Sequence, residues 1–171
     1  MRALTRKDDY AVRAVLDIAR HHPERRTTRQ ITTAMDLPRE FTSQILATLV
    51  RGDLLHSTSG PAGGYTLARE PHEITLLHIA EAADGPITTH ECLLSGGSAD
   101  WIEVCPLHQA WSEAGAAFTR HLDKTTIASL TQIDIAIRAG TYQPPDHTPP
   151  HPTTPPRRGT ESGTDPADSA L

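Results

Sequence analysis

Both cysteines of the chain lie in one short stretch, HECLLSGGSADWIEVCPLH, which spans residues 90–108. His90 stands two residues before Cys92, and His108 stands three residues after Cys105. Thiolates and imidazoles are ligands of zinc and of iron–sulfur clusters, and two thiols can also form a reversible disulfide. A Cys-x-x-His spacing at the start of a helix places both side chains on one face. The stretch therefore predicts a metal site, a thiol switch or two idle thiols.

The composition is that of one small globular domain with an extension. The chain has 171 residues, of which 4% are aromatic, so its core must be built mainly from aliphatic side chains. It has no run of eighteen apolar residues, and acidic residues interrupt its start, MRALTRKDDY, before any apolar run. We expect a soluble cytoplasmic protein, in which a reducing environment opposes a permanent disulfide.

The net charge of −5 is unevenly distributed along the chain. Residues 1–69 contain 11 Lys and Arg against 7 Asp and Glu, a net of +4. Residues 70–140 contain 3 against 10, a net of −7, and residues 141–171 contain 2 against 4, a net of −2. A basic first half beside an acidic second half is typical of a polyanion-binding module joined to a module of another kind, although ordinary scatter of surface charge gives the same pattern.

The first half of the chain has the periodicity of three short helices followed by a hairpin. We expect helices over residues 8–22, 27–36 and 38–52, then strands over 54–58 and 64–68 joined by a Gly/Pro turn. Thr27 or Thr28 caps the second helix, Pro38 suits the first turn of the third, and Gly52 ends it. The expected apolar faces are Ala11, Ala14, Val15, Ile18 and Ala19; Ile31 and Ala34; and Phe41, Ile45, Leu46 and Leu49. This order predicts a winged helix-turn-helix.

Beyond Pro71 the sequence predicts three more helices, over residues 73–85, 106–124 and 125–140. Their apolar positions are Ile74, Leu77, Ile79 and Ala80; Leu107, Trp111, Ala114, Phe118 and Leu122; and Ile127, Leu130, Ile133, Ile135 and Ile137. Helices this apolar outside a small winged domain need a partner surface, and a second copy of the chain is the economical one. Residues 141–171 hold eight of the fourteen prolines and predict a disordered tail.

Four stretches of the sequence resemble one family. They are LTRKDDYAVRAVLDIA, LPREFTSQILATLVRGDLL, the wing SGPAGGYTLAR, and the cysteine loop that ends in CPLH. The chain from Met1 to about Gly140 resembles the Rrf-two family of bacterial transcriptional regulators, whose iron–sulfur members sense the cluster or nitric oxide. The resemblance implies a homodimer with two winged helix-turn-helix heads, a long dimerisation helix and, often, a cluster between them.

The resemblance also implies how the head contacts DNA. The second helix of a helix-turn-helix lies in the major groove, with its first residues nearest the bases, while basic side chains contact phosphates. The expected recognition-helix contacts are Arg39, Glu40, Thr42, Ser43 and Gln44; the wing contacts are Ser57, Thr58, Ser59 and Gly60; and the phosphate contacts are Arg2, Arg6, Lys7, Arg25, Arg26 and Arg29. Many relatives carry an arginine where this chain has Ser59, which puts minor-groove reading in question.

For the cysteine loop, the resemblance implies an iron–sulfur site with an altered ligand set. Relatives place three cysteines there, but the middle position falls at Ser98 and Ala99. A 2Fe–2S cluster tolerates histidine ligands better than a 4Fe–4S cluster does. The preferred set is Cys92, Cys105, His108 and, aligned with an acidic ligand of relatives, Asp9 from the other subunit, with His90 as the alternative fourth ligand. Zinc at His90, Cys92, Cys105 and His108, a disulfide switch and no site remain open.

We therefore expect a mostly α fold with a small β wing: residues 1–84 form a winged helix-turn-helix, 85–106 a sensor loop, 107–140 dimerisation helices and 141–171 the tail. The expected function is a dimeric regulator, a repressor rather than an activator, that binds a palindromic site in double-stranded DNA and responds to redox or to its cluster. A cluster-free thiol switch and a winged-helix protein-interaction module are the alternatives. We expect no enzyme, because the sequence has no phosphate loop, nucleophile elbow or convergent acid–base pair.

Overall fold

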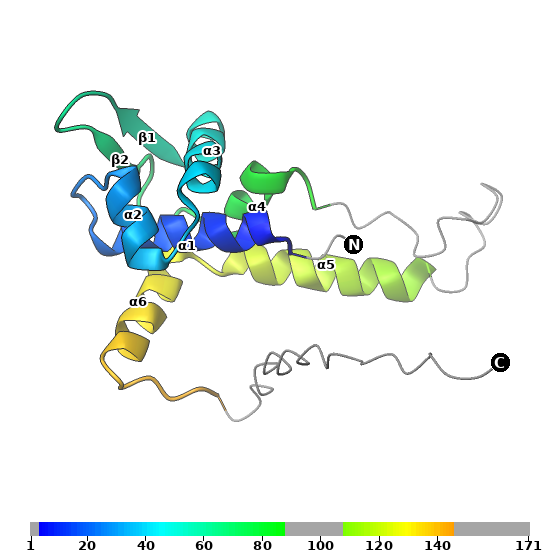
Figure 1. The fold of residues 1–171 in the computed structure, drawn as a ribbon. Helices are drawn as coiled ribbons and strands as arrows, with labels where there is room; N and C mark the ends of the chain where they lie inside the picture. The colour runs from blue at the N-terminus through cyan, green and yellow to red at the C-terminus, as the bar shows by residue number, and fades with distance from the viewer. Residues whose placement is uncertain (1–3, 88–107, 146–171) are drawn as a thin grey trace, which may run out of the picture.

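The computed structural model describes residues 4–87 and 108–145. Within these ranges, six helices and one two-stranded antiparallel sheet follow one another in the order of the sequence prediction (Figure 1). They are α1 (Arg6–Arg20), α2 (Thr28–Met35), α3 (Arg39–Arg51), β1 (Leu55–Thr58), β2 (Gly64–Leu67), α4 (Leu76–Asp84), α5 (His108–Lys124) and α6 (Ile127–Arg138). The mostly helical fold with a small β wing is confirmed.

Threonine side chains fix where several of the helices begin. Thr5 precedes α1 and forms a capping box with Asp8, whose Oδ2 accepts a hydrogen bond of 2.7 Å from the Thr5 amide. Thr27 does the same for α2 with Gln30, at 2.8 Å. Such caps satisfy amides that have no partner within the helix. For α2, this cap selects Thr27 from the two threonines that the sequence left open.

Helices α1 to α4 and the β hairpin form the winged helix-turn-helix, which we call the head. Its core lies where α1 packs against α2, α3 and α4. All five apolar positions predicted for α1 are buried. Ile31, Ile45, Leu46 and Leu49 are buried as well, and Phe41 is partly buried against Tyr10. The prediction for α2 was wrong at one position, because Ala34 is exposed and Met35 is buried instead. Met35 lies one helical turn after Ile31, so the two share the inward face.

The wing is the hairpin of β1 and β2. The strands pair antiparallel, with Leu55 opposite Leu67 and Thr58 opposite Gly64. Leu55 and Leu67 are buried at the base of the hairpin, whereas His56, Ser57 and Thr58 are exposed. The wing is thus attached to the core at one end and extends from it at the other (Figure 1).

Helices α5 and α6 meet at a turn that is hydrogen-bonded to the segment before α4. The Ile127 amide donates to the Ile74 carbonyl at 2.8 Å, and the Leu76 amide donates to the Thr125 carbonyl at 2.9 Å. From this turn α5 extends beside the head and past it, while α6 projects away from the head (Figure 1). Within the described ranges, no helix combines the length and apolar character needed to cross a membrane.

Candidate nucleic-acid interface

The polar side of α3 is open to solvent. Arg39, Glu40, Ser43 and Gln44 are all exposed, while Ile45 and Leu46 are buried. The Ser43 hydroxyl donates to the Arg39 carbonyl at 3.1 Å, which leaves its lone pairs available to a donor from outside. Four of the five residues that were expected to contact bases therefore lie on one surface of the helix, as helical periodicity requires.

Thr42, the fifth, lies on the other side of the helix. Its side chain is 1% exposed, and its hydroxyl donates to the Pro38 carbonyl at 2.8 Å. Thr42 stands one turn before Leu46, so it shares the buried face with that residue. Its assignment as a base contact is corrected: Thr42 is a core residue with a satisfied hydroxyl.

Arg51 lies on the exposed side of α3 and was not singled out from the sequence. It is exposed, and its guanidinium donates to the Thr48 hydroxyl at 2.9 Å. The spacing of four from Arg39 through Ser43 and Ala47 to Arg51 places all four on one line of the helix surface. That spacing is the signal that would have found Arg51.

The tip of the wing is exposed and tightly turned. Ser57, Ser59 and Gly60 are all exposed, as expected for residues that approach another molecule. The Gly63 amide donates to the Gly60 carbonyl at 2.9 Å. A Cβ on Gly63 would lie 2.3 Å from the Thr58 carbonyl oxygen, so this turn has no room for a side chain at that position.

Arg26 fixes the wing to the head. Its backbone pairs with Tyr65 of β2 through hydrogen bonds of 3.0 and 2.9 Å. Its guanidinium Nε donates to the buried carboxylate of Asp17 at 2.9 Å. The expectation that Arg26 contacts phosphate is corrected, because its charge is used inside the protein.

The other basic residues lie at different places. Arg29 is exposed on α2. Lys7 lies in the first turn of α1, where its ammonium group is 3.1 Å from Asp84 of α4. Because Asp17, which holds the wing, is ten residues further along α1, Lys7 stands about 15 Å away along the helix axis. The structure therefore does not bring Lys7 together with the wing. Arg2 lies outside the described residues.

Asp9 is the one predicted metal ligand whose side chain the structure describes. It is 57% exposed and lies 3.6 Å from Arg13, an ion pair of the weak, exposed kind. Its neighbour Asp8 is buried and holds the Thr5 cap. Of the two acids, Asp9 is thus the one that can reach a ligand outside its own helix.

The other predicted ligands cannot be placed in the same way. Cys92, Cys105 and His90 lie outside the described residues, and His108 is the first residue of α5, with a side chain that is not described. Among the described residues, no group of three or more His, Cys, Asp and Glu side chains is arranged to hold a metal ion.

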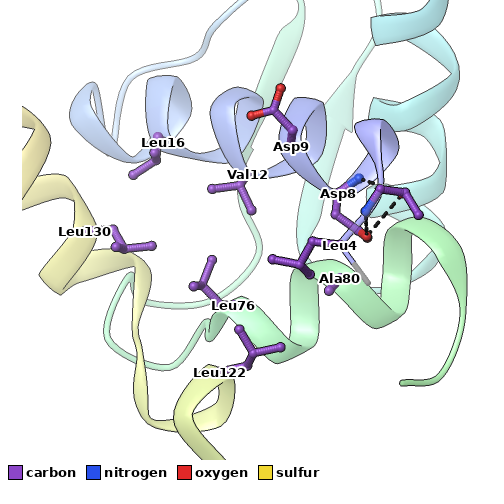
Figure 2. A pocket seen from close by; sticks show the side chains of 10 residues that line it. Leu4, Asp8, Asp9, Val12, Leu16, Leu76, Ala80, Leu122 and Leu130 are labelled. Carbon is purple, nitrogen blue, oxygen red and sulfur yellow. Dashed lines mark hydrogen bonds between the residues drawn. The ribbon is translucent and has the colours of Figure 1, made fainter. Parts of the chain in front are cut away.

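An apolar pocket of about 390 Å³ lies beside Asp9, where α1 faces α4 and the turn between α5 and α6. Figure 2 shows aliphatic side chains from α1, α4, α5 and α6, and from the residues just before α1, pointing toward one another across it. They are Leu4, Val12, Leu16, Leu76, Ala80, Leu122 and Leu130. This face of α1 therefore carries an apolar pocket beside Asp9. The wing is instead supported at Asp17 of α1, through Arg26.

The fold defines a winged helix-turn-helix protein. Of its first three helices, the third is exposed and follows the second after a tight connection, and a hairpin is held beside them. A family model named Rrf2 and described as an iron-dependent transcriptional regulator matches residues 4–133. The chain therefore belongs to the Rrf2 (Rrf-two) family of transcriptional regulators, as the four sequence stretches predicted.

Named relatives agree with this assignment. An rrf2-like HTH-type transcriptional regulator of Rhodobacter capsulatus is 32% identical over 94 residues, which cover 53% of this chain and 63% of that one. The HTH-type transcriptional regulator IscR of Citrobacter koseri is 26% identical over 150 residues, 85% of this chain and 91% of that one.

Solved structures share the fold. The global cysteine regulator CymR of B. subtilis superposes with a TM-score of 0.65 at 26% identity, covering 77% of this chain and 98% of that one. IscR of T. potens superposes with a TM-score of 0.61 at 24% identity, covering 84% and 94%. At that identity, the second likeness concerns the fold alone.

Proposed function

We propose that this protein is a dimeric, sequence-specific DNA-binding repressor that works in the cytoplasm and responds to redox state or to an iron–sulfur cluster. The observation that carries the DNA-binding part is the exposed polar side of α3 next to a wing that is held to the head at Arg26. Residues 1–84 form the DNA-binding unit, 85–106 the sensor segment and 107–140 the dimerisation helices.

Base recognition falls to the first turns of α3. Arg39 contacts guanine or phosphate, and Gln44 pairs with adenine through its amide. Ser43 contacts either a base edge or a phosphate. Glu40 accepts from a cytosine amino group or remains solvated, because its carboxylate is repelled by phosphates.

Phosphate contacts position the head on the duplex. Arg29 and the wing residues Ser57, Ser59 and Gly60 are exposed and supply them without reading sequence. Arg51 adds a further cation at the far end of α3. Lys7 and Arg2 are assigned weaker, peripheral contacts.

The second copy of the chain covers the apolar surfaces of α5 and α6. Ile133, Ile135 and Ile137 of α6 are 38%, 47% and 56% exposed, although isoleucine is among the residues most often buried. A two-fold dimer places two copies of α3 side by side, so its operator is a palindrome with half-sites about one helical turn apart.

Cys92, Cys105 and His108, with Asp9 of the partner subunit, form the proposed cluster site. Two thiolates, an imidazole and a carboxylate suit a 2Fe–2S cluster better than a 4Fe–4S cluster. The exposed position of Asp9, and its weak pairing with Arg13, support its assignment, because little free energy is lost when it turns to another partner. A bound cluster would supply a redox-sensitive link between the subunits.

The DNA-binding proposal is tested by capture of genomic DNA fragments on the purified protein. The recovered fragments should share a palindrome, and binding to them should weaken steeply with salt. An Arg39→Ala, Gln44→Ala double variant that binds these fragments with unchanged affinity and selectivity contradicts the proposal. Lys124→Ala, an exposed cation at the end of α5, is the matched control and should bind normally.

The cofactor proposal is tested by anaerobic purification with an absorbance spectrum and with iron, sulfide and zinc analysis. Visible absorbance with equal iron and sulfide is expected, and Cys92→Ala and Asp9→Ala should each change the spectrum. Colourless protein that contains zinc supports the zinc site instead. Colourless protein free of metal, with a disulfide that forms reversibly, supports the thiol switch.

A further inference from the structure

A row of alternating charges runs from Arg26, which precedes α2 and pairs with the wing, through α1 to α6. At its centre the fully buried carboxylate of Asp17 accepts hydrogen bonds of 2.9 Å from Arg26 Nε and 2.9 Å from Arg20 Nη2. On its far side, Arg20 Nε lies 3.2 Å from Asp134 of α6. Arg138 donates to the same oxygen of Asp134 at 3.0 Å. These five side chains join the segment before α2, helix α1 and helix α6.

Burial makes this arrangement act as a unit. The side chains of Arg20 and Arg26 are only 12% and 14% exposed, and Asp17 has no contact with solvent. A buried carboxylate is tolerated only while its cationic partners stay in place. Because Arg20 is shared between Asp17 and Asp134, a shift of α6 changes how well Asp17 is compensated. Arg26 then holds the carboxylate through two hydrogen bonds, while the ring of His21 is more distant, with Nδ1 at 3.8 Å from Asp17.

Arg26 is also the residue that pairs with the wing. Its amide donates to the Tyr65 carbonyl at 3.0 Å, and its carbonyl accepts from the Tyr65 amide at 2.9 Å. A Cβ on Gly64 would lie 2.8 Å from the Arg26 carbonyl oxygen, so β2 fits closely against this residue. The position of the Arg26 side chain and the position of β2 are therefore linked.

We propose that Asp17 is a positioning residue for the wing, and that α6 acts on the wing through Asp134 and Arg20. The proposal rests on the proposed function in that the wing contacts DNA. It assigns to α6 a second role beside dimerisation: its docking on α1 biases the affinity of the head for DNA.

The direction in which DNA affinity changes when Asp17 or Asp134 loses its charge distinguishes this proposal from simple electrostatics. Asp17→Asn and Asp134→Asn each remove a negative charge, which by itself should strengthen binding to a polyanion. A positioning role predicts the opposite, because the wing is no longer held in its binding position. We expect DNA affinity to fall about threefold to tenfold in Asp134→Asn and more in Asp17→Asn, a range typical of coupled neighbours.

The affinities are measured on the captured genomic fragment, at a temperature where circular dichroism shows each variant to be folded. Asp53→Asn is the matched control, because Asp53 is exposed, has φ 54° and is outside this charge row, and asparagine tolerates that backbone conformation. It should bind as tightly as the unaltered protein or slightly tighter. Amide hydrogen exchange at Tyr65 and Arg26 is followed in parallel, and should accelerate in Asp134→Asn but not in the control.

A double-variant cycle between Arg26→Gln and Asp134→Asn tests the coupling across the row. These two side chains do not share a hydrogen bond, so independent effects would multiply. Coupling through Asp17 predicts that Asp134→Asn costs little once Arg26 is already changed. Multiplying effects contradict the action of α6 on the wing.

The outcomes also separate this inference from the proposed function. If Asp17→Asn does not fold, Asp134→Asn at the solvent-accessible end of the row still decides the matter. Unchanged exchange at Tyr65 in a folded Asp134→Asn protein overturns the inference, whatever the protein binds. If the unaltered protein binds no DNA, the proposed function fails, while faster exchange at Tyr65 would still support the link between α6 and the wing.

Discussion

Arg26 and Tyr65 exchange both of their backbone hydrogen bonds, at 3.0 and 2.9 Å, although they lie on either side of the helix-turn-helix in the sequence. Tyr65 also pairs with Ser57 of β1, so the backbone of Arg26 continues the sheet on its other side. Strand β2 is therefore paired along both edges, with β1 on one side and with the chain that enters α2 on the other.

Gly64→Ala should release the wing. Gly64 has φ +155°, which L residues rarely adopt, and a new Cβ would collide with the Arg26 carbonyl. We expect DNA affinity to fall about tenfold or more, with helix content by circular dichroism retained because the helices do not depend on this contact. Ala62→Ser, at an exposed position in the same turn, is the control and should bind normally. Equal affinity of the two variants would show that the tether is dispensable.

The inward face of α2 can be tested by a pair of neighbouring substitutions. Met35→Ala should destabilise the protein by about 2 kcal/mol or more, because it leaves a cavity in the core. Ala34→Ser should change the free energy of unfolding by less than about 0.5 kcal/mol, because this position is exposed. Urea unfolding at one fixed protein concentration measures both. A larger loss of stability in Ala34→Ser than in Met35→Ala would show that Ala34 lies on the buried face of α2, as expected from the sequence.

These two positions show what local sequence patterns reveal and what they leave open. The helices of the head were predictable because periodic apolar residues, capping threonines and Gly52 act over one or two turns. In a helix of eight residues, however, alanine gives little indication of which side is buried, and Ala34 was expected on the inward face that Met35 occupies. Two turns carry too few apolar residues to fix the face.

Thr42→Val tests the corrected role of Thr42. Valine keeps the shape but removes the hydroxyl that donates to the Pro38 carbonyl, so we expect a loss of about 1 kcal/mol in the free energy of unfolding. Its selectivity among operator sequences should be unchanged. Gln44→Ala should do the reverse, with normal stability and relaxed selectivity at one base pair. Competition binding with single-base operator variants distinguishes them, and altered selectivity in Thr42→Val would place the residue back at the interface.

The exposed isoleucines of α6 provide a test of the dimer. Ile133 and Ile137 are four residues apart and share a face, so the double change Ile133→Glu, Ile137→Glu places two charges where a second copy is proposed to pack. Sedimentation equilibrium should then show a monomer, against a dimer for the unaltered chain. Gln132→Glu adds one charge at an exposed position of the same helix and should remain dimeric. A double variant that is still dimeric would move the interface elsewhere.

The candidate site was less predictable than the fold, for a physical reason. Exposure of Arg39, Ser43 and Gln44 follows from the helical period, which the sequence carries locally. The use of Arg26 depends on Asp17, which lies on another element and becomes its partner only after the chain folds. Arg26 follows Arg25 directly and precedes Arg29 by three residues, so the sequence alone indicates a surface charge. Only the folded structure shows that its partner is the buried carboxylate of Asp17. Arg51 was missed although its spacing from Arg39 was available.

Fluorescence anisotropy on a captured palindromic fragment measures whether α3 reads a DNA sequence. The unaltered chain should bind the palindrome more tightly than a scrambled fragment of equal length by a factor of about a thousand or more, which is the lower end of the range for specific DNA-binding proteins. The Arg39→Ala, Gln44→Ala protein should lose most of this preference. Equal affinity for palindrome and scrambled DNA, or an unaltered preference in the double variant, would show that α3 does not read the sequence.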